Sequence, residues 1–200
     1  MQALSFDEIS ILGYPLSISE IFQKKNSNKD IVSSLSVIDQ IHNFCLQKNK
    51  KLLVYFSMAF GNPYEEYWDV DILIKYIDII QEKGITMISL ADTIGNSTPK
   101  AIKTIYAEVL KSFPLLDIGL HLHSRPENSF DKINSGWDAG CRRFDTTISG
   151  YGGCPFAQDQ LIGNIATETL LNFIAHNKVN HSLNSLAFES AYNQAKEIFN

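Results

Sequence analysis

Residues 86–110, TMISLADTIGNSTPKAIKTIYAEVL, contain one β-strand pattern followed by one α-helix pattern. The run at 86–90 is short and apolar, which is typical of a buried strand. Thr98 and Pro99 then supply an N-cap side chain and a proline at the first helical position, which predict a helix start. The apolar residues that follow recur at helical spacing: Ile102, Ile105, Tyr106, Val109 and Leu110. This stretch therefore predicts one strand–helix unit.

The same unit recurs on both sides of this stretch. Runs rich in β-branched and aromatic residues predict five strands, at residues 8–12, 51–56, 86–90, 116–120 and 142–148. The first expected helix begins after Asp30, and the second contains Leu73, Ile77 and Ile80 and ends before Gly84. The third follows Thr98, and the fourth contains Phe130, Ile133 and Trp137 and ends before Gly140. The last two cover 166–175 and 183–199. Because parallel strands need long crossover connections, this alternation predicts a parallel sheet with helices outside it.

Composition predicts one folded domain. The chain has 200 residues, of which 44% are hydrophobic and 20% charged, so it can bury a core. A closed (β/α)8 barrel needs about 250 residues, so length by itself favours a doubly wound open sheet. The net charge of −5 argues against nucleic acid or an anionic membrane surface as a partner. No apolar run approaches the roughly 18 residues of a membrane span.

The cysteines and the first residues predict a cytoplasmic protein. Cys45, Cys141 and Cys154 are an odd number without CxxC spacing, which is typical of a reducing compartment. The start, MQALSFDEIS, lacks the basic and apolar regions of a signal peptide. Cys45 lies on the apolar face of a helix and Cys141 at a strand entry, so we expect both in the core.

Polar residues gather where the expected strands end. Ser57 follows the second strand, Asp92 the third, His121 and His123 end the fourth, and a small-residue loop at 150–155, GYGGCP, follows the fifth. Parallel α/β folds build their sites at the carboxyl ends of the strands. We therefore expect all of these residues to face one site.

Each of these residues also has a purely structural interpretation. His121 and His123 lie two residues apart, so on a strand both imidazoles can reach one cation, or one caps the strand while the other packs. Cys154 brings a thiol near a substrate or simply occupies a turn. Three roles are open for Asp92: a metal ligand, a group that orients a histidine, or a local turn cap. Asn164 is ordinarily a helix-start residue.

Five motifs in this order resemble the 3-hydroxy-3-methylglutaryl-CoA (HMG-CoA) lyase family, within the metal-dependent TIM-barrel lyases and Claisen-type synthases. They are SMAFGNPYE at 57–65, ISLADTIG at 88–95, HLH at 121–123, GYGGCPFA at 150–157 and GNIATE at 163–168. The resemblance runs from about residue 6 to the end. It departs from the family pattern at 124–128, SRPEN, where many members have an Asp-Thr-Tyr-Gly run.

The resemblance implies a fold and a site. The fold would be a (β/α)8 TIM barrel, with residues 1–200 as a single C-terminal part that covers strands 4 to 8. The three N-terminal strand–helix units, including a first-strand Arg-Asp pair, find no match upstream of Glu8. By position, the resemblance makes His121, His123 and Asn164 ligands of Mg²⁺ or Mn²⁺ and Cys154 the catalytic thiol. Asp92 and Ser57 would support the site or bind substrate.

The activity implied by the resemblance is retro-Claisen cleavage of the acyl-CoA substrate HMG-CoA to acetyl-CoA and acetoacetate, as in leucine degradation or ketone-body metabolism. We expect little activity from this chain alone, because the first-strand pair is missing. The alternatives are a Claisen-type synthase, such as homocitrate or isopropylmalate synthase, and a non-catalytic fragment of a truncated or mis-started gene. Family members are usually dimers, so a homodimer is one expected assembly.

Overall fold

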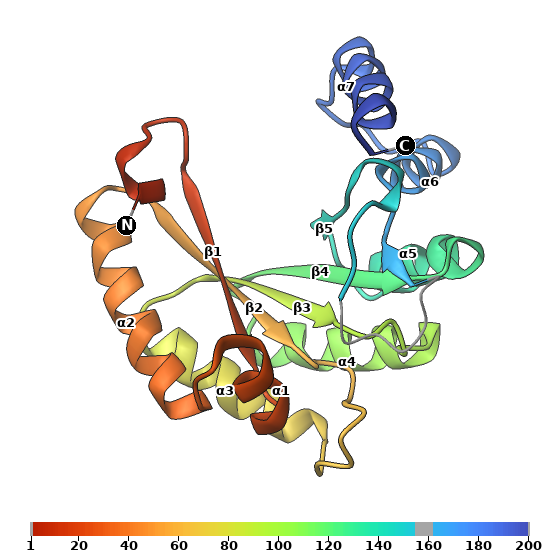
Figure 1. Ribbon diagram of the computed structural model, residues 1–200. Coiled ribbons are helices and arrows are strands. Elements are labelled where there is room, and N and C mark those ends of the chain that lie inside the picture. The colour runs from red at the N-terminus through yellow and green to blue at the C-terminus, as the bar shows by residue number, and fades with distance from the viewer. Residues whose placement is uncertain (1, 155–161, 200) are drawn as a thin grey trace.

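A computed structural model describes residues 2–154 and 162–199 and contains a parallel sheet in the order β1-β2-β3-β4-β5 (Figure 1). The strands are β1 Ile11–Ser17, β2 Lys51–Ser57, β3 Met87–Asp92, β4 Asp117–Ser124 and β5 Phe144–Asp145. A doubly wound sheet reverses its strand order part-way, whereas here each crossover adds the next strand on the same side. The strands therefore form an open arc of a (β/α)8 barrel. The expectation from length alone is wrong, and the partial barrel is confirmed.

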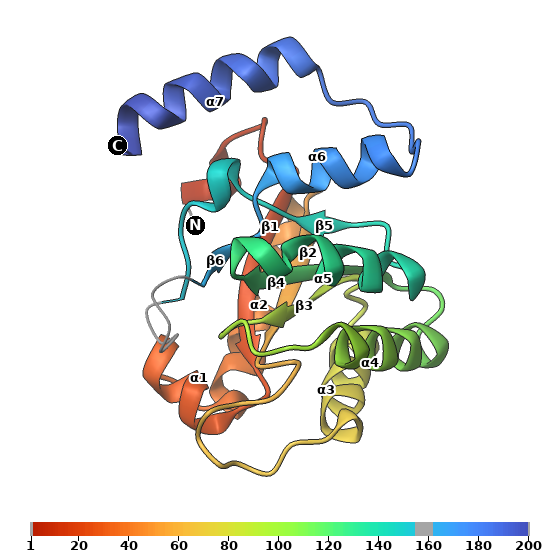
Figure 2. The same ribbon diagram turned by 90° about the vertical axis from the view of Figure 1, so that its right-hand side faces the viewer.

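Helices cover one side of this arc, and the last helix of the chain stands apart from the sheet (Figure 1). They are α1 Glu20–Ser27, α2 Ile31–Gln47, α3 Val70–Glu82, α4 Pro99–Ser112, α5 Pro126–Asp138, α6 Thr167–His176 and α7 Ser185–Phe199. Helices α3, α4 and α5 lie side by side (Figure 2). Two 3-10 helices, η1 Gln2–Ser5 and η2 Ile148–Gly150, and the short strand β6 Gly163–Asn164 complete the described elements. Among these residues no helix is long and apolar enough to cross a membrane.

The helix starts expected from capping residues are confirmed. The Asp30 carboxylate accepts from Ser33 N at 2.6 Å at the start of α2. The Thr98 hydroxyl accepts from Ala101 N at 3.2 Å at the start of α4. Gly84 lies just after α3 with a φ of 83°, a conformation that glycine adopts without strain. Capping is local chemistry, so the sequence pattern was sufficient to predict it.

Two strand boundaries are wrong. The first strand does not cover 8–12 but runs over Ile11–Ser17, and Pro15 lies within it. Proline is tolerated there because β1 is an edge strand. The expected fifth strand at 142–148 pairs over only Phe144–Asp145, because the chain turns into η2 directly afterwards. Helix α1 was not expected, since its sequence EIFQKKNS is polar and short.

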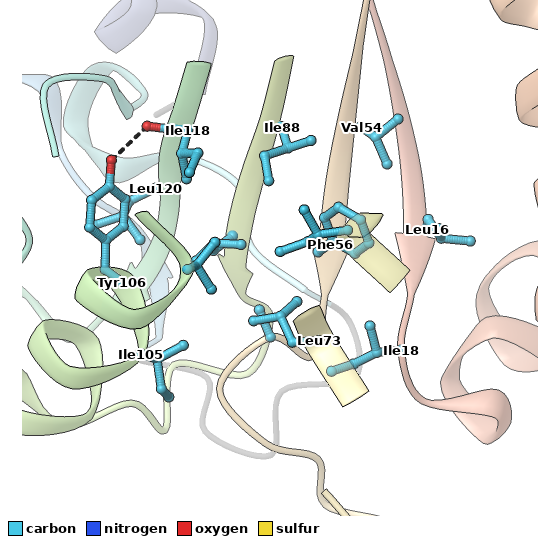
Figure 3. Packing of buried hydrophobic residues seen from close by; sticks show 14 of the residues in the cluster. Leu16, Ile18, Val54, Phe56, Leu73, Ile88, Ile105, Tyr106, Ile118 and Leu120 are labelled. Carbon is cyan, nitrogen blue, oxygen red and sulfur yellow. Dashed lines mark hydrogen bonds between the residues drawn. The ribbon is translucent and has the colours of Figure 1, made fainter. Parts of the chain in front are cut away.

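Alternation along the strands separates an apolar outer side from an inner side that mixes apolar and polar side chains. Residues on the outer side pack against the helices and are fully or nearly fully buried; they include Leu16, Val54, Phe56, Ile88, Leu90, Ile118 and Leu120 (Figure 3). Tyr106 of α4 joins this core and donates its hydroxyl hydrogen to Ile118 O at 2.8 Å. Cys45 and Cys141 are both fully buried in the same core, as expected. The inner side is therefore the side left for chemistry.

Candidate functional site

A hollow of about 340 Å³ lies on the inner side at the carboxyl ends of the strands. Polar groups on its wall come from Ser57, Thr93, His121 and His123, and the remaining lining residues are Gly13, Pro15, Tyr55 and Ala91. Its size is in the range of small-molecule sites. Because successive residues of a strand face opposite sides, His121 and His123 both project into the hollow from β4. We call this space the inner hollow.

The two imidazoles are spaced as ligands of one cation would be. His121 Nε2 and His123 Nε2 lie 3.2 Å apart. Two imidazole nitrogens that each bind a metal at about 2.1 Å, at roughly a right angle, are about 3 Å apart. The Nδ1 atoms of both rings are buried and have no hydrogen-bond partner among the described residues. The spacing thus fits a shared cation, and the role of the pair as metal ligands remains a prediction.

Asn164 is paired with His123 but does not line the inner hollow; it lines a second hollow with Gly150 and Tyr151. Strand β6 runs antiparallel to β4, and its register pairs Asn164 directly with His123. Opposed residues of an antiparallel pair project to the same side. The Asn164 amide nitrogen donates to Tyr151 O at 3.0 Å, which leaves Oδ1 as the atom suited to a cation. Asn164 is not a helix-start residue, because the N-cap of α6 is Ala166.

The described residues supply a limited ligand set. Within residues 2–154 and 162–199, no group of three or more His, Cys, Asp or Glu side chains is placed to hold a metal. A cation here would take two imidazole nitrogens and one amide oxygen from this chain. That mixed nitrogen and oxygen set suits Mn²⁺ or Zn²⁺ and, with added oxygen ligands, Mg²⁺.

Asp92 does not face the inner hollow, so the expectation that every strand-end residue faces one site is wrong for it. Its neighbour Ala91 lines the hollow, and alternation directs Asp92 to the outer side. There the carboxylate is 1% exposed and lies 2.7 Å from Lys132 Nζ. It also accepts from the Ser97 hydroxyl and, at 3.2 Å, from Ser97 N. Asp92 supports the strand end and does not touch the hollow.

Cys154 is not among the residues that line the inner hollow. The side chain is half-buried and packs at the margin of the apolar core. It lies close enough to Tyr64 to help burial raise the pKa of that phenol. Residues 155–161, the remainder of this loop and of the motif at 150–157, lie outside the described residues. The catalytic role of Cys154 therefore remains a prediction.

Sequence reasoning missed the groups around His121. Asp145 Oδ2 lies 3.8 Å from His121 Nδ1 and accepts from the Ser89 hydroxyl at 2.9 Å. The Tyr55 ring meets the His121 ring edge-on, with centroids 5.6 Å apart. Burial and then Asp145 raise the pKa of Tyr55. Alternation along the expected strands at 51–56 and 142–148 is the signal that could have placed Tyr55 and Asp145 on the inner side.

Both imidazoles are held neutral. Burial lowers the pKa of His121, and the Asp145 carboxylate offsets part of that effect. The pKa of His123 falls to about 4, chiefly through burial and then through the neighbouring His121, since two protonated rings so close would repel each other. Neutral imidazole is the form that binds a metal. Near neutral pH both nitrogens are thus available.

The buried His123 predicts a loss of stability in acid. Its pKa is lower in the folded chain than the roughly 6.5 of the unfolded chain, so stability is complete above about pH 6.5 and falls as pH drops toward 4. One pKa unit corresponds to about 1.4 kcal/mol. Between pH 7 and pH 4.5 we expect His123 to account for about 2–3 kcal/mol of lost unfolding free energy, measured by urea titration of the metal-free chain. His123→Gln should flatten that dependence by this amount, and equal slopes for both proteins would contradict the assignment.

Comparison with known proteins identifies the family. A sequence model described as HMGL-like matches residues 9–194. The chain belongs to the HMGL-like family. It is 33% identical over 156 residues to hydroxymethylglutaryl-CoA lyase YngG of Bacillus subtilis, an alignment that covers 78% of this chain and 52% of that protein. It is 32% identical over 164 residues to the cytoplasmic 3-hydroxy-3-methylglutaryl-CoA lyase of Rattus norvegicus, covering 82% of this chain and 47% of that one.

Solved structures agree with this assignment. The crystal structure of the Bacillus subtilis HMG-CoA lyase superposes with a TM-score of 0.87 at 30% identity, over 94% of this chain and 63% of that chain. An HMG-CoA lyase from an Acinetobacter species (baumannii), in complex with coenzyme A and 3-methylmalate, gives a TM-score of 0.78 at 26% identity, over 88% of this chain and 57% of that one. The resemblance found from the five motifs is confirmed. The HMGL-like chain spans about half the length of the curated relatives it matches.

Proposed function

We propose that this HMGL-like chain is part of a carbon–carbon lyase that cleaves HMG-CoA to acetyl-CoA and acetoacetate. The observation that carries this proposal is the His121–His123 pair, with nitrogens 3.2 Å apart in a strand-end hollow. The curated relatives described above are named HMG-CoA lyases. A related lyase has been solved with coenzyme A, which supports an acyl-CoA substrate.

Residues of the inner hollow, together with Asn164, would bind and orient the substrate. His121, His123 and Asn164 would hold Mg²⁺ or Mn²⁺, which supplies Lewis-acid polarisation and a template for the substrate oxygens. Ser57 and Thr93 place hydroxyl groups on the wall of the same hollow, where they can hydrogen-bond to the acyl group.

In the proposed reaction the tertiary hydroxyl would lose its proton to solvent, and its oxygen would become the ketone of acetoacetate. The neighbouring carbon–carbon bond breaks, and its electron pair passes to the thioester as an enolate. Cys154 would then donate its thiol proton to that carbon, which yields acetyl-CoA.

A cytoplasmic location, a homodimer and a role in leucine degradation or ketone-body metabolism remain predictions, since named relatives include both cytoplasmic and mitochondrial enzymes.

A cleavage assay tests the proposal. HMG-CoA would be supplied with Mn²⁺ to residues 1–200 and to the longest open reading frame that contains them, and acetyl-CoA and acetoacetate would be measured. We expect equal amounts of the two products from a longer protein with the family's first-strand Arg-Asp pair, and only trace turnover from residues 1–200. His121→Gln is the matched control and should abolish cleavage. Condensation of acetyl-CoA with a 2-oxo acid, without cleavage, would instead identify a Claisen-type synthase. A robust rate from residues 1–200 would overturn the expected need for that pair.

A further inference from the structure

We propose that Lys132 is a positioning residue, which holds the candidate ligand His123 in place from the outer side of the sheet. Lys132 belongs to α5 and is 3% exposed. The proposal rests on the metal site described above but concerns a residue that never touches the inner hollow.

Every hydrogen of the Lys132 ammonium group has a hydrogen-bond acceptor. Nζ lies 2.7 Å from Asp92 Oδ2, 2.9 Å from His123 O and 3.0 Å from Gly95 O. An ammonium has three donor hydrogens, so each has one acceptor. A charge so deeply buried is stable only when it is paired and hydrogen-bonded in this way. Its position is therefore set by all three partners together.

His123 lies where the parallel ladder of β4 ends. The register with β5 ends at His121, and the register with β3 ends at Leu122. Beyond these points, the backbone of His123 is held by the two-residue pairing with β6 and by the Lys132 donor. Strand ends tend to fray unless their backbone groups are bonded. Lys132 thus fixes the carbonyl of a residue whose imidazole projects to the opposite side.

The same ammonium connects His123 to the loop after β3. Gly95 and Asp92 belong to that loop and strand end, and Thr93 between them lines the inner hollow. The Thr93 hydroxyl accepts from Met58 N at 2.8 Å, which joins the end of β2 to the same assembly. One buried lysine therefore joins the ends of β3 and β4 directly, and Thr93 joins the end of β2 to them.

A purely stabilising role of Lys132 and a positioning role predict different metal affinities when both buried charges are removed. If Lys132 serves only to neutralise Asp92, removal of both charges should restore the folded chain and its metal affinity together. If Lys132 positions His123, removal of both charges should restore folding but leave the metal affinity weakened. The double variant Asp92→Asn/Lys132→Met separates the two roles and avoids the unpaired carboxylate that Lys132→Met alone would leave.

Calorimetric titration with Ni²⁺ tests the proposal on residues 1–200 at pH 7.5. Ni²⁺ binds nitrogen ligands more tightly than Mn²⁺ does, so a site with two imidazoles is measurable. We expect Asp92→Asn/Lys132→Met to weaken Ni²⁺ binding by about 10–100-fold, the usual effect of losing a group that supports a ligand. The matched control is Lys103→Met, since Lys103 is 58% exposed on α4 and should leave affinity unchanged.

The outcomes are distinguishable. Wild-type affinity in a folded double variant would overturn the positioning role and leave the metal site intact. Failure of the wild-type chain to bind Ni²⁺, or equal binding by His123→Gln, would overturn the proposed metal site itself and this inference with it. Weakened binding in the double variant, together with unchanged binding in Lys103→Met, would support the role.

Discussion

Replacement of Lys132 by methionine should lower the free energy of unfolding by about 3–5 kcal/mol, the cost of breaking a buried ion pair from one side. The substitution leaves the Asp92 carboxylate, 1% exposed, without the positive charge 2.7 Å away. It also removes the donor from His123 O and Gly95 O. Methionine fills a similar volume, so the effect measures charge and hydrogen bonding and not a cavity. Urea unfolding followed by far-ultraviolet circular dichroism at pH 7 gives the value.

Two matched variants show whether the lost stability comes from the buried ion pair. Asp92→Asn/Lys132→Met should recover much of the loss, because no uncompensated charge remains and the new amide can still accept from Ser97 N. Lys103→Met removes a surface lysine that lies 3.5 Å from Asp138, and exposed pairs of this kind contribute at most about 1 kcal/mol. A Lys132→Met variant as stable as Lys103→Met would show that the buried pair does not contribute.

Cys154→Ser should reduce the turnover of HMG-CoA by about 10²–10⁴-fold in the complete lyase, the range contributed by a positioned general acid or base. A hydroxyl is a far weaker acid than a thiol, so it transfers a proton to carbon poorly. The loop that carries Cys154 is attached to the proposed ligand Asn164, since Tyr151 O accepts from the Asn164 amide and Gly152 lies against Asn164. Steady-state cleavage assays and Ni²⁺ titration on the same protein provide the two measurements.

Metal affinity and a second cysteine serve as controls. Ni²⁺ binding should be unchanged in Cys154→Ser, because the thiol is not one of the proposed ligands. Burial raises the pKa of Cys141 to about 11, and this side chain lies in the apolar core. Cys141→Ala should therefore lower stability but leave turnover per folded molecule unchanged. Full turnover in Cys154→Ser would remove Cys154 from the mechanism, and loss of metal would reassign it to the metal site.

Local signals in the sequence were sufficient for most of the secondary structure. Asp30 and Thr98 begin helices because their side chains accept from backbone groups only three residues away. The strand at 51–56 was correct to within one residue because its apolar run is uninterrupted. Prediction failed for β1, where Gly13 and Pro15 interrupt the pattern of an edge strand, and for β5, where the chain leaves the sheet after two residues. The boundaries of β1 and β5 depend on how each strand pairs with its neighbours in the sheet.

By itself the sequence determined the family, the order of the strand–helix units and the spacing that directs His121 and His123 to one side of a strand. These depend on motifs and on alternation, which are properties of consecutive residues. Only the tertiary structure decided that Asp92 lies on the outer side with Lys132, that Asn164 pairs with His123, and that Asp145 and Tyr55 surround His121. Each of these contacts joins segments far apart in the chain, and the register of the sheet and the packing of α5 bring them together.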